Sequence, residues 1–297
     1  MKKLLYIILC GMLASACTKE IDFDFQNDEP AVVIEGKVTN QGRSVVISRS
    51  RSVTDSVHTR CLPGASVMIT CGDSTTVLDY DVAKDCYYSD IPGVPGQTYR
   101  MLVEFEGKQY VATATMQGEA PIVSSEFYWL TMVGERVLFY EMWAKDLEPD
   151  VRNYYMIRIK RQSHHPHFEG KHYSDLYGWD VFDDRGCPPG MLFIDWAMVS
   201  EQVMDDDKKD DWKQIVYDGD SISVELMTVD HQVYNYLSEL RSGQNNGVNP
   251  RSNISGGCLG YFAAGTVTRT APVVFRRNDV SEWRNDMKSK FLPFVTN

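Results

Sequence analysis

The chain has 297 residues and a formal net charge of −11. Its 43% hydrophobic and 24% charged residues are typical of a folded globular protein, and its length suggests two domains of ordinary size. The acidic balance argues against nucleic acid as a partner, because phosphate backbones are bound by clustered Lys and Arg.

The chain begins with the pattern of an export signal. Lys2 and Lys3 precede an apolar run, residues 4–13, which is too short for a stable membrane anchor of about 20 apolar residues. Small residues then stand directly before Cys17. We therefore predict that residues 1–16 are a lipoprotein signal peptide and that Cys17 is lipidated; an ordinary secretory peptide with an incidental cysteine is the alternative.

Residues 17–30 are polar and have few core-forming side chains, so we predict a flexible tether behind the lipidated cysteine. Lys19-Glu20 resembles the export signal that directs Bacteroidota lipoproteins to the outer leaflet of the outer membrane. We expect a lipid-anchored protein on the outer membrane that faces the cell exterior, with a periplasmic orientation as the alternative. The N-terminal lipid is then its contact with the membrane.

Short strands separated by turns fill residues 31–118. Asn40-Gln41-Gly42 and Glu106-Gly107-Lys108 have the composition of hairpin turns. We predict strands at 31–39, 44–50, 65–70, 87–88, 98–105 and 109–116. Antiparallel sheets with one apolar face bury that face on each other, so the region predicts an immunoglobulin- or transthyretin-like β-sandwich, followed by a linker at 117–121.

Residues 122–297 predict a larger β-rich domain with one or two short helices. Asp230 is a suitable cap for an amphipathic helix that ends near Gly243, and residues 281–290 are a weaker helix candidate. Strands are predicted at 126–130, 137–144, 154–160, 191–198 and 221–227. The fold class is therefore mainly β.

Residues 162–190 lack a sustained period and are rich in histidine, glycine and aromatic residues. We interpret them as a long irregular excursion. Aromatic groups on such a loop suit a partner-binding surface. We therefore expect residues 165–185 to be dispensable for folding and to contribute to partner binding.

The same excursion contains the best metal-site candidates. Imidazoles bind zinc or copper, and Asp175, Asp183 or Asp184 could complete a shell. The histidines in question are His164, His165, His167 and His172. A flexible His-rich loop without metal is the interpretation we favour, so no cofactor is expected. None of the common hydrolase motifs occurs, and we expect a protein that is not an enzyme.

Export to an oxidising compartment permits disulfides and surface modification. Five cysteines remain after Cys17, and the pairings to test are Cys71–Cys86 and Cys187–Cys258, with buried free thiols, including Cys61, as the favoured alternative. Short Asp-Ser-apolar segments resemble Bacteroidota O-glycosylation acceptors; their serines are Ser56, Ser74 and Ser221.

Residues 249–262 read Asn-Pro-Arg-Ser-Asn-Ile-Ser-Gly-Gly-Cys-Leu-Gly-Tyr-Phe. They resemble the signature N-P-x-x-N-I-x-G-G-x-L-G-Y-F of a Bacteroidota outer-membrane lipoprotein family classed as a domain of unknown function (4249). Weaker matches lie at 64–67, 96–99 and 153–155; Cys258 and the excursion depart from the pattern. The glycines and Asn253 suit a fold-defining strand crossing better than a ligand cradle, because the helix and Lys of a phosphate-binding loop are missing.

The family's genes typically lie beside TonB-dependent receptors. The resemblance therefore implies a non-enzymatic accessory or binding subunit of a TonB-dependent nutrient transporter, with that receptor as partner. A structural or adhesive surface lipoprotein is one alternative, and a metal-dependent enzyme that uses the His164–His172 cluster is the other.

Overall fold

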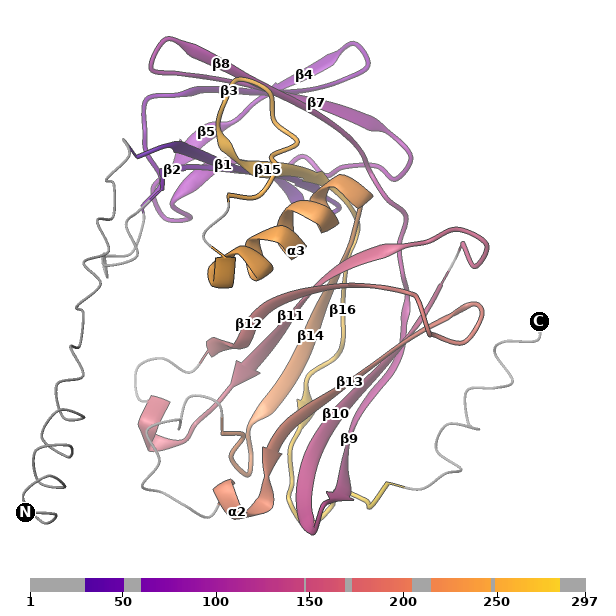
Figure 1. The fold of residues 1–297 in the computed structure, drawn as a ribbon. Helices are drawn as coiled ribbons and strands as arrows, with labels where there is room; N and C mark the ends of the chain where they lie inside the picture. The colour runs from indigo at the N-terminus through magenta and orange to yellow at the C-terminus, as the bar shows by residue number, and fades with distance from the viewer. Residues whose placement is uncertain are drawn as a thin grey trace, which may run out of the picture. The chain divides into compact units, whose positions relative to one another are not determined.

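A computed structural model describes residues 30–50, 60–146, 148–168, 173–204, 215–246 and 249–283. Within these ranges the protein is mainly β, as predicted, and its strands form four sheets (Figure 1). Cys17, Ser56, His172 and most of the predicted helix at 281–290 lie outside the described residues.

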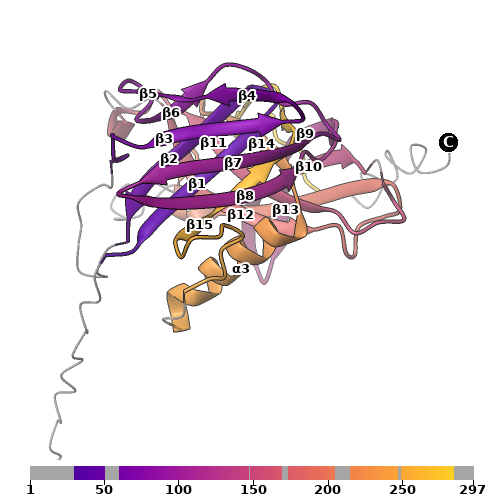
Figure 2. The ribbon, with the colours of Figure 1, turned by 90° about the horizontal axis from the view of Figure 1, so that it is seen from above.

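The first sandwich pairs a five-stranded with a four-stranded sheet (Figure 2). The five-stranded sheet has the order β15 (Leu259–Ala264), β1 (Val32–Thr39), β2 (Gly42–Arg49), β6 (Cys86–Ser89) and β5 (Asp79–Asp81). The other has the order β4 (Ser74–Val77), β3 (Ser66–Cys71), β7 (Thr98–Phe105) and β8 (Lys108–Thr115). Alternating side chains of both sheets form one core, in which Ile34, Ile47, Ile69 and Met101 are fully buried. The predicted N-terminal sandwich is confirmed.

The two predicted hairpins of this sandwich are also confirmed. β1 and β2 pair from Val32↔Arg49 to Thr39↔Gly42 around the Asn40-Gln41 turn. β7 and β8 meet at Glu106 and Gly107, whose φ angles of 51° and 74° match the type I′ geometry that fits the strand twist.

β15 joins the first sandwich from the far end of the chain. It pairs in parallel with β1, from Val33↔Leu259 to Val38↔Ala264. Ile254 and Cys258, just before it, are buried in the first core. The predicted boundary between 31–118 and 122–297 therefore needs correction, since the first sandwich takes a strand that the sequence assigned to the second domain. Local periodicity cannot reveal a parallel partner so distant in sequence.

The glycine-rich motif is what lets β15 approach β1. Gly260 has φ = 107°, and a Cβ built there would lie 1.9 Å from the Ile34 carbonyl oxygen. The Asn253 side-chain amide donates to the Phe262 carbonyl at 2.9 Å, and its oxygen accepts the Phe262 N–H at 2.9 Å. The motif thus allows β15 to pair closely with β1, which agrees with the interpretation that it defines a strand crossing and does not bind a ligand.

The second sandwich combines a three-stranded sheet with a larger one. The three-stranded sheet has the order β13 (Met191–Ser200), β10 (Glu135–Lys145) and β9 (Ile122–Met132). The larger has the order β12 (Tyr173–Asp183), β11 (Tyr154–Gln162), β14 (Ser221–Val229) and β16 (Val267–Arg269), with β17 (Val273–Val274) beside β14. Large aromatic residues fill its core, among them Trp129, Tyr140, Tyr155 and Phe275. Two short helical segments, η1 (Pro166–Phe168) and α2 (Glu201–Met204), flank these strands.

The predicted irregular excursion at 162–190 is wrong at residues 173–183, which form β12. β12 pairs with β11 from Tyr154↔Asp183 to Gln162↔Tyr173, and its Leu176 is 1% exposed in the second core. The register shifts between Arg158 and Ile159, so β12 bulges and its alternation is broken. That break concealed the strand in the sequence. Residues 165–185 are consequently not dispensable, because they include the whole of the edge strand β12 and part of the core.

The predicted helix is confirmed as α3 (His231–Asn246). Asp230 caps it, since its Oδ1 accepts the Val233 N–H at 2.9 Å. Val233 and Leu237 of α3 are buried in a third cluster with Met156 and Met227 of the larger sheet and Tyr261 of β15. The helix therefore packs on strands of both sandwiches (Figure 1).

Cys61, Cys71, Cys86, Cys187 and Cys258 are free thiols in the structure, so neither of the two disulfide pairings put forward for testing is formed. Cys187 packs on the second core whereas Cys258 lies in the first. Cys71 and Cys86 belong to different sheets of the first sandwich. Burial raises the pKa of Cys258 to about 11, which keeps the thiol protonated and poorly reactive.

Replacement of Gly260 by Ala tests whether the close approach of β15 to β1 is required. The added methyl cannot fit against the Ile34 carbonyl, so we expect the free energy of unfolding to fall by about 3 kcal/mol or more. Gly257→Ala is the matched control, because Gly257 also has a positive φ (81°) but open space around its Cβ. It should cost only about 1 kcal/mol of backbone strain. Equal losses in urea unfolding would contradict this account.

Candidate functional site

A cleft of about 460 Å³ opens between β12 and β13, where the two sheets of the second sandwich end beside each other. One wall consists of Ile157, Ile159 and Leu176 from the larger sheet. Trp196 and Ala197 of β13 form the other wall. We call this hollow the edge cleft. Its volume lies within the roughly 300–1,000 Å³ typical of small-ligand sites.

The bulge of β12 shapes the edge cleft. The bulged residues include Gly178, which has φ = 71° and lines the cleft without a side chain. Leu176, before the bulge, faces Ile159 and the core, whereas Trp179, after it, pairs with Arg158 and packs on the α3 cluster. A bulge re-aims side chains and stops the strand from pairing regularly, and here it leaves the gap between the sheets open.

A single ion pair lies at the mouth of the cleft. The guanidinium of Arg241, on α3, contacts Asp180 of β12, and these are the charged residues among those lining the cleft. Asp180 Oδ1 also accepts the Val181 N–H at 2.7 Å. The Arg241 side chain is 60% exposed. The site therefore combines apolar walls with one accessible cation, an arrangement that can bind an amphipathic molecule.

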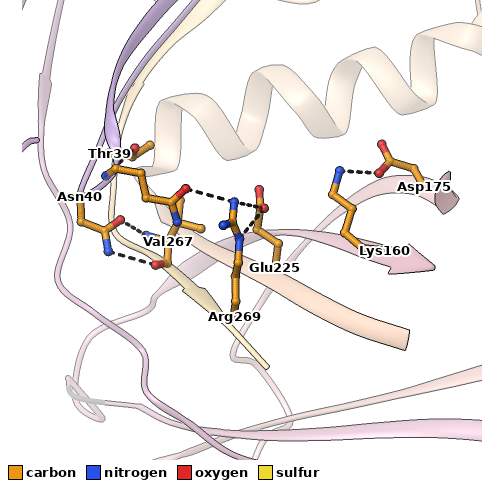
Figure 3. A network of polar contacts seen from close by, with 8 residues as sticks. Thr39, Asn40, Lys160, Asp175, Glu225, Val267 and Arg269 are labelled. Atoms are coloured by element: carbon orange, nitrogen blue, oxygen red, sulfur yellow. Dashed lines mark hydrogen bonds and ion pairs between the residues drawn. The ribbon is translucent and has the colours of Figure 1, made fainter. Parts of the chain in front are cut away.

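A second hollow, of about 520 Å³, lies on the other face of the larger sheet. Two ion pairs line it, Lys160–Asp175 at 2.5 Å and Arg269–Glu225 at 2.8 Å (Figure 3). All four side chains are at least partly solvated, so each pair contributes at most about 1 kcal/mol. Most residues that line this hollow are charged or polar, and their ion pairs are satisfied within the protein.

The contacts beside this hollow connect the two sandwiches. Arg269 also donates to the Gln41 side chain at 3.0 Å. Asn40 forms two hydrogen bonds with the Val267 backbone, at 3.1 and 2.9 Å (Figure 3). The β1–β2 turn is thereby attached to β16, and we assign this network a structural role.

The candidate metal ligands that the structure describes do not come together. His165 stacks on Tyr217 with ring centroids 3.7 Å apart, and His167 lies 4.8 Å from His165. Asp175 is engaged by Lys160, and Asp183 by Arg152 and Arg185. Across the part of the chain that the structure describes, no three His, Cys, Asp or Glu side chains form a group able to hold a metal ion. His164 belongs to no such group either.

Sequence reasoning missed a buried polar cluster close to this histidine loop. Arg161, Ser163 and Asp220 are each at most 1% exposed. Arg161 donates to the Ile215 carbonyl at 2.9 Å, and its guanidinium stacks 3.9 Å from the Phe168 ring centroid. Burial raises the pKa of Asp220, although Ser163, the Tyr217 N–H and Arg161 favour its charged form. The sequence signal that could have revealed this cluster is Arg161, a charged residue at a position of β11 that is buried.

The serine candidates differ in accessibility. Ser74 is exposed at the start of β4. Ser221 is half-buried at the start of β14 and pairs with Gln162 on one side and Val274 on the other. Modification of either residue stays a prediction.

Residues 18–271 match the family model described as Domain of unknown function (DUF4249). The chain belongs to this family. The matched range contains both sandwiches, α3 and the glycine-rich motif. A comparison with curated proteins found no match. Among the described residues, no helix is long and apolar enough to cross a membrane.

Substitution of Asp220 by Asn tests the buried polar cluster through pH. With its pKa raised above the usual 3.8, the folded protein binds this proton more tightly than the unfolded chain, so stability from this group is lost as pH rises. Asn carries no charge to bury. We expect the melting temperature of Asp220→Asn, relative to wild type, to increase between about pH 4 and about pH 7. A difference in melting temperature that stays constant over this pH range would be the contrary result.

Proposed function

We propose that the protein is a lipid-anchored, non-enzymatic binding subunit of a TonB-dependent outer-membrane transporter. The N-terminal pattern that ends at Cys17 supports the anchor. The family resemblance supports the transporter, since genes of this family typically lie beside such receptors. The tether at 17–30 would hold the sandwiches within reach of a membrane partner.

The edge cleft is the observation that carries the binding role. Its walls are aliphatic and aromatic, and none of its lining residues is a histidine, cysteine or serine. Such a lining holds a ligand by burying apolar surface, and its one carboxylate, Asp180, is engaged in the ion pair with Arg241. A cleft of this volume and lining suits a subunit that captures a small ligand.

Affinity purification of the full chain from detergent-solubilised membranes tests the proposal. We expect a β-barrel transporter to co-purify at near-equal amount. Cys17→Ser should abolish lipid labelling and release the protein from the membrane fraction, yet the purified variant should still capture the transporter. Another lipoprotein with the same affinity tag is the control.

Absence of a barrel protein above the level of that control would contradict the proposal and favour a structural or adhesive surface protein. Stoichiometric metal in the purified protein would instead favour the enzyme alternative. Protease treatment of intact cells tests orientation separately, because a surface-facing protein should be digested while a periplasmic marker survives.

A further inference from the structure

We propose that the edge cleft binds amphipathic carboxylates, that is, molecules with an apolar chain or ring and one carboxylate group. The inference rests on the proposed binding function and specifies its ligand class. Two features of the cleft carry it: apolar walls that continue into the sandwich core, and a cation at the mouth.

The interior of the cleft selects an apolar body. Ile159 and Leu176 belong to the second core and are 3% and 1% exposed, so the floor of the cleft is the core itself. Trp196, on the opposite wall, also packs on this core and lies 6.4 Å from Tyr140 between ring centroids. The charged groups of the lining are Asp180 and Arg241, so away from this ion pair a charged ligand group would lose its hydration without an opposite charge to meet. An aliphatic or aromatic group would bury the accessible surface of Trp179, Trp196 and Ala197 above this floor.

The mouth of the cleft selects a negative charge. Arg241 has five N–H donors, and Asp180 is the ion-pair partner that the structure gives it. Asp180, by contrast, shares its Oδ1 between Arg241 and the Val181 N–H and is less exposed, 36% against 60%. A ligand carboxylate can therefore bind the outward N–H groups of Arg241 without displacing Asp180. A cationic ligand would instead have to bind Asp180, whose side chain is less exposed and already accepts two hydrogen bonds.

The position of Arg241 also fits this selection. Its helix packs with Val233 and Leu237 against the larger sheet, and the ion pair with Asp180 holds the guanidinium beside β12. The protein's overall charge of −11 disfavours anions at long range, but salt screens that repulsion beyond about 8 Å. Recognition of a carboxylate in this acidic protein must then come from a local contact, which Arg241 supplies.

Isothermal titration calorimetry with the full chain tests the proposal, with Cys17→Ser present so that no detergent competes for the cleft. The probes are decanoate, octanoate and butanoate, together with decanol as the uncharged analogue. We expect decanoate to bind at one site. Affinity should fall by about fourfold for each methylene removed, because each methylene buries a fixed apolar area.

Two variants separate the roles of charge and wall. Arg241→Gln should weaken decanoate binding by roughly fivefold and leave decanol unchanged, as expected for a partly exposed ion pair. Arg251→Gln is the matched control, since Arg251 is 92% exposed and does not line the cleft. Trp196→Ala should weaken both decanoate and decanol. If that variant does not fold, the Arg241 comparison decides.

No binding of decanoate, affinity independent of chain length, or equal effects of Arg241→Gln on decanoate and decanol would each overturn the proposal. The outcome is distinguishable from failure of the transporter role. If decanoate fails to bind but the transporter co-purifies, the ligand class is wrong and the accessory function stands. If decanoate binds as predicted without a transporter, the ligand site stands and the accessory function fails.

Discussion

The parallel pairing of β15 with β1 is the constraint on which the rest of the structure depends. It places a strand from the C-terminal region inside the first sandwich, and the same chain continues within three residues into β16 of the second. At the crossing, the Gly265 N–H donates to the Val38 carbonyl at 3.0 Å, and a Cβ at Gly265 would lie 1.8 Å from the Thr228 carbonyl oxygen. The crossing therefore fixes each sandwich against the other through backbone contacts.

This constraint reaches the edge cleft through α3. The helix lies between β14 and β15 in the chain, and it is buried against side chains of both sandwiches. Because Asp230 caps one end and β15 is held by β1, Arg241 is brought to Asp180 of β12. Arg241, at the mouth of the edge cleft in the second sandwich, is thus positioned by β15, which is a strand of the first sandwich. The bulge at Gly178 supplies the opening itself.

The parts of the fold predictable from sequence are those encoded locally. Hairpin turns such as Glu106-Gly107, alternating strands such as β7, and the Asp230 cap each depend on a few neighbouring residues. The parallel partner of β15 and the burial of Asp220 depend on contacts between distant segments, so no local period reveals them. β12 was missed because its bulge breaks alternation. For the edge cleft, the sequence indicated the aromatic residues around Trp179, but it did not indicate Trp196 or Arg241.

Native-state hydrogen exchange tests most directly the claim that β15 and α3 unite the sandwiches into one cooperative unit. The amides to compare are those of β1 and β15 with those of β11 and β14. The account predicts the same free energy of opening for both groups, because the first sandwich cannot open without releasing β15 and α3. Opening of β1 and β15 at a free energy lower by more than about 1 kcal/mol, with β11 and β14 still protected, would contradict it.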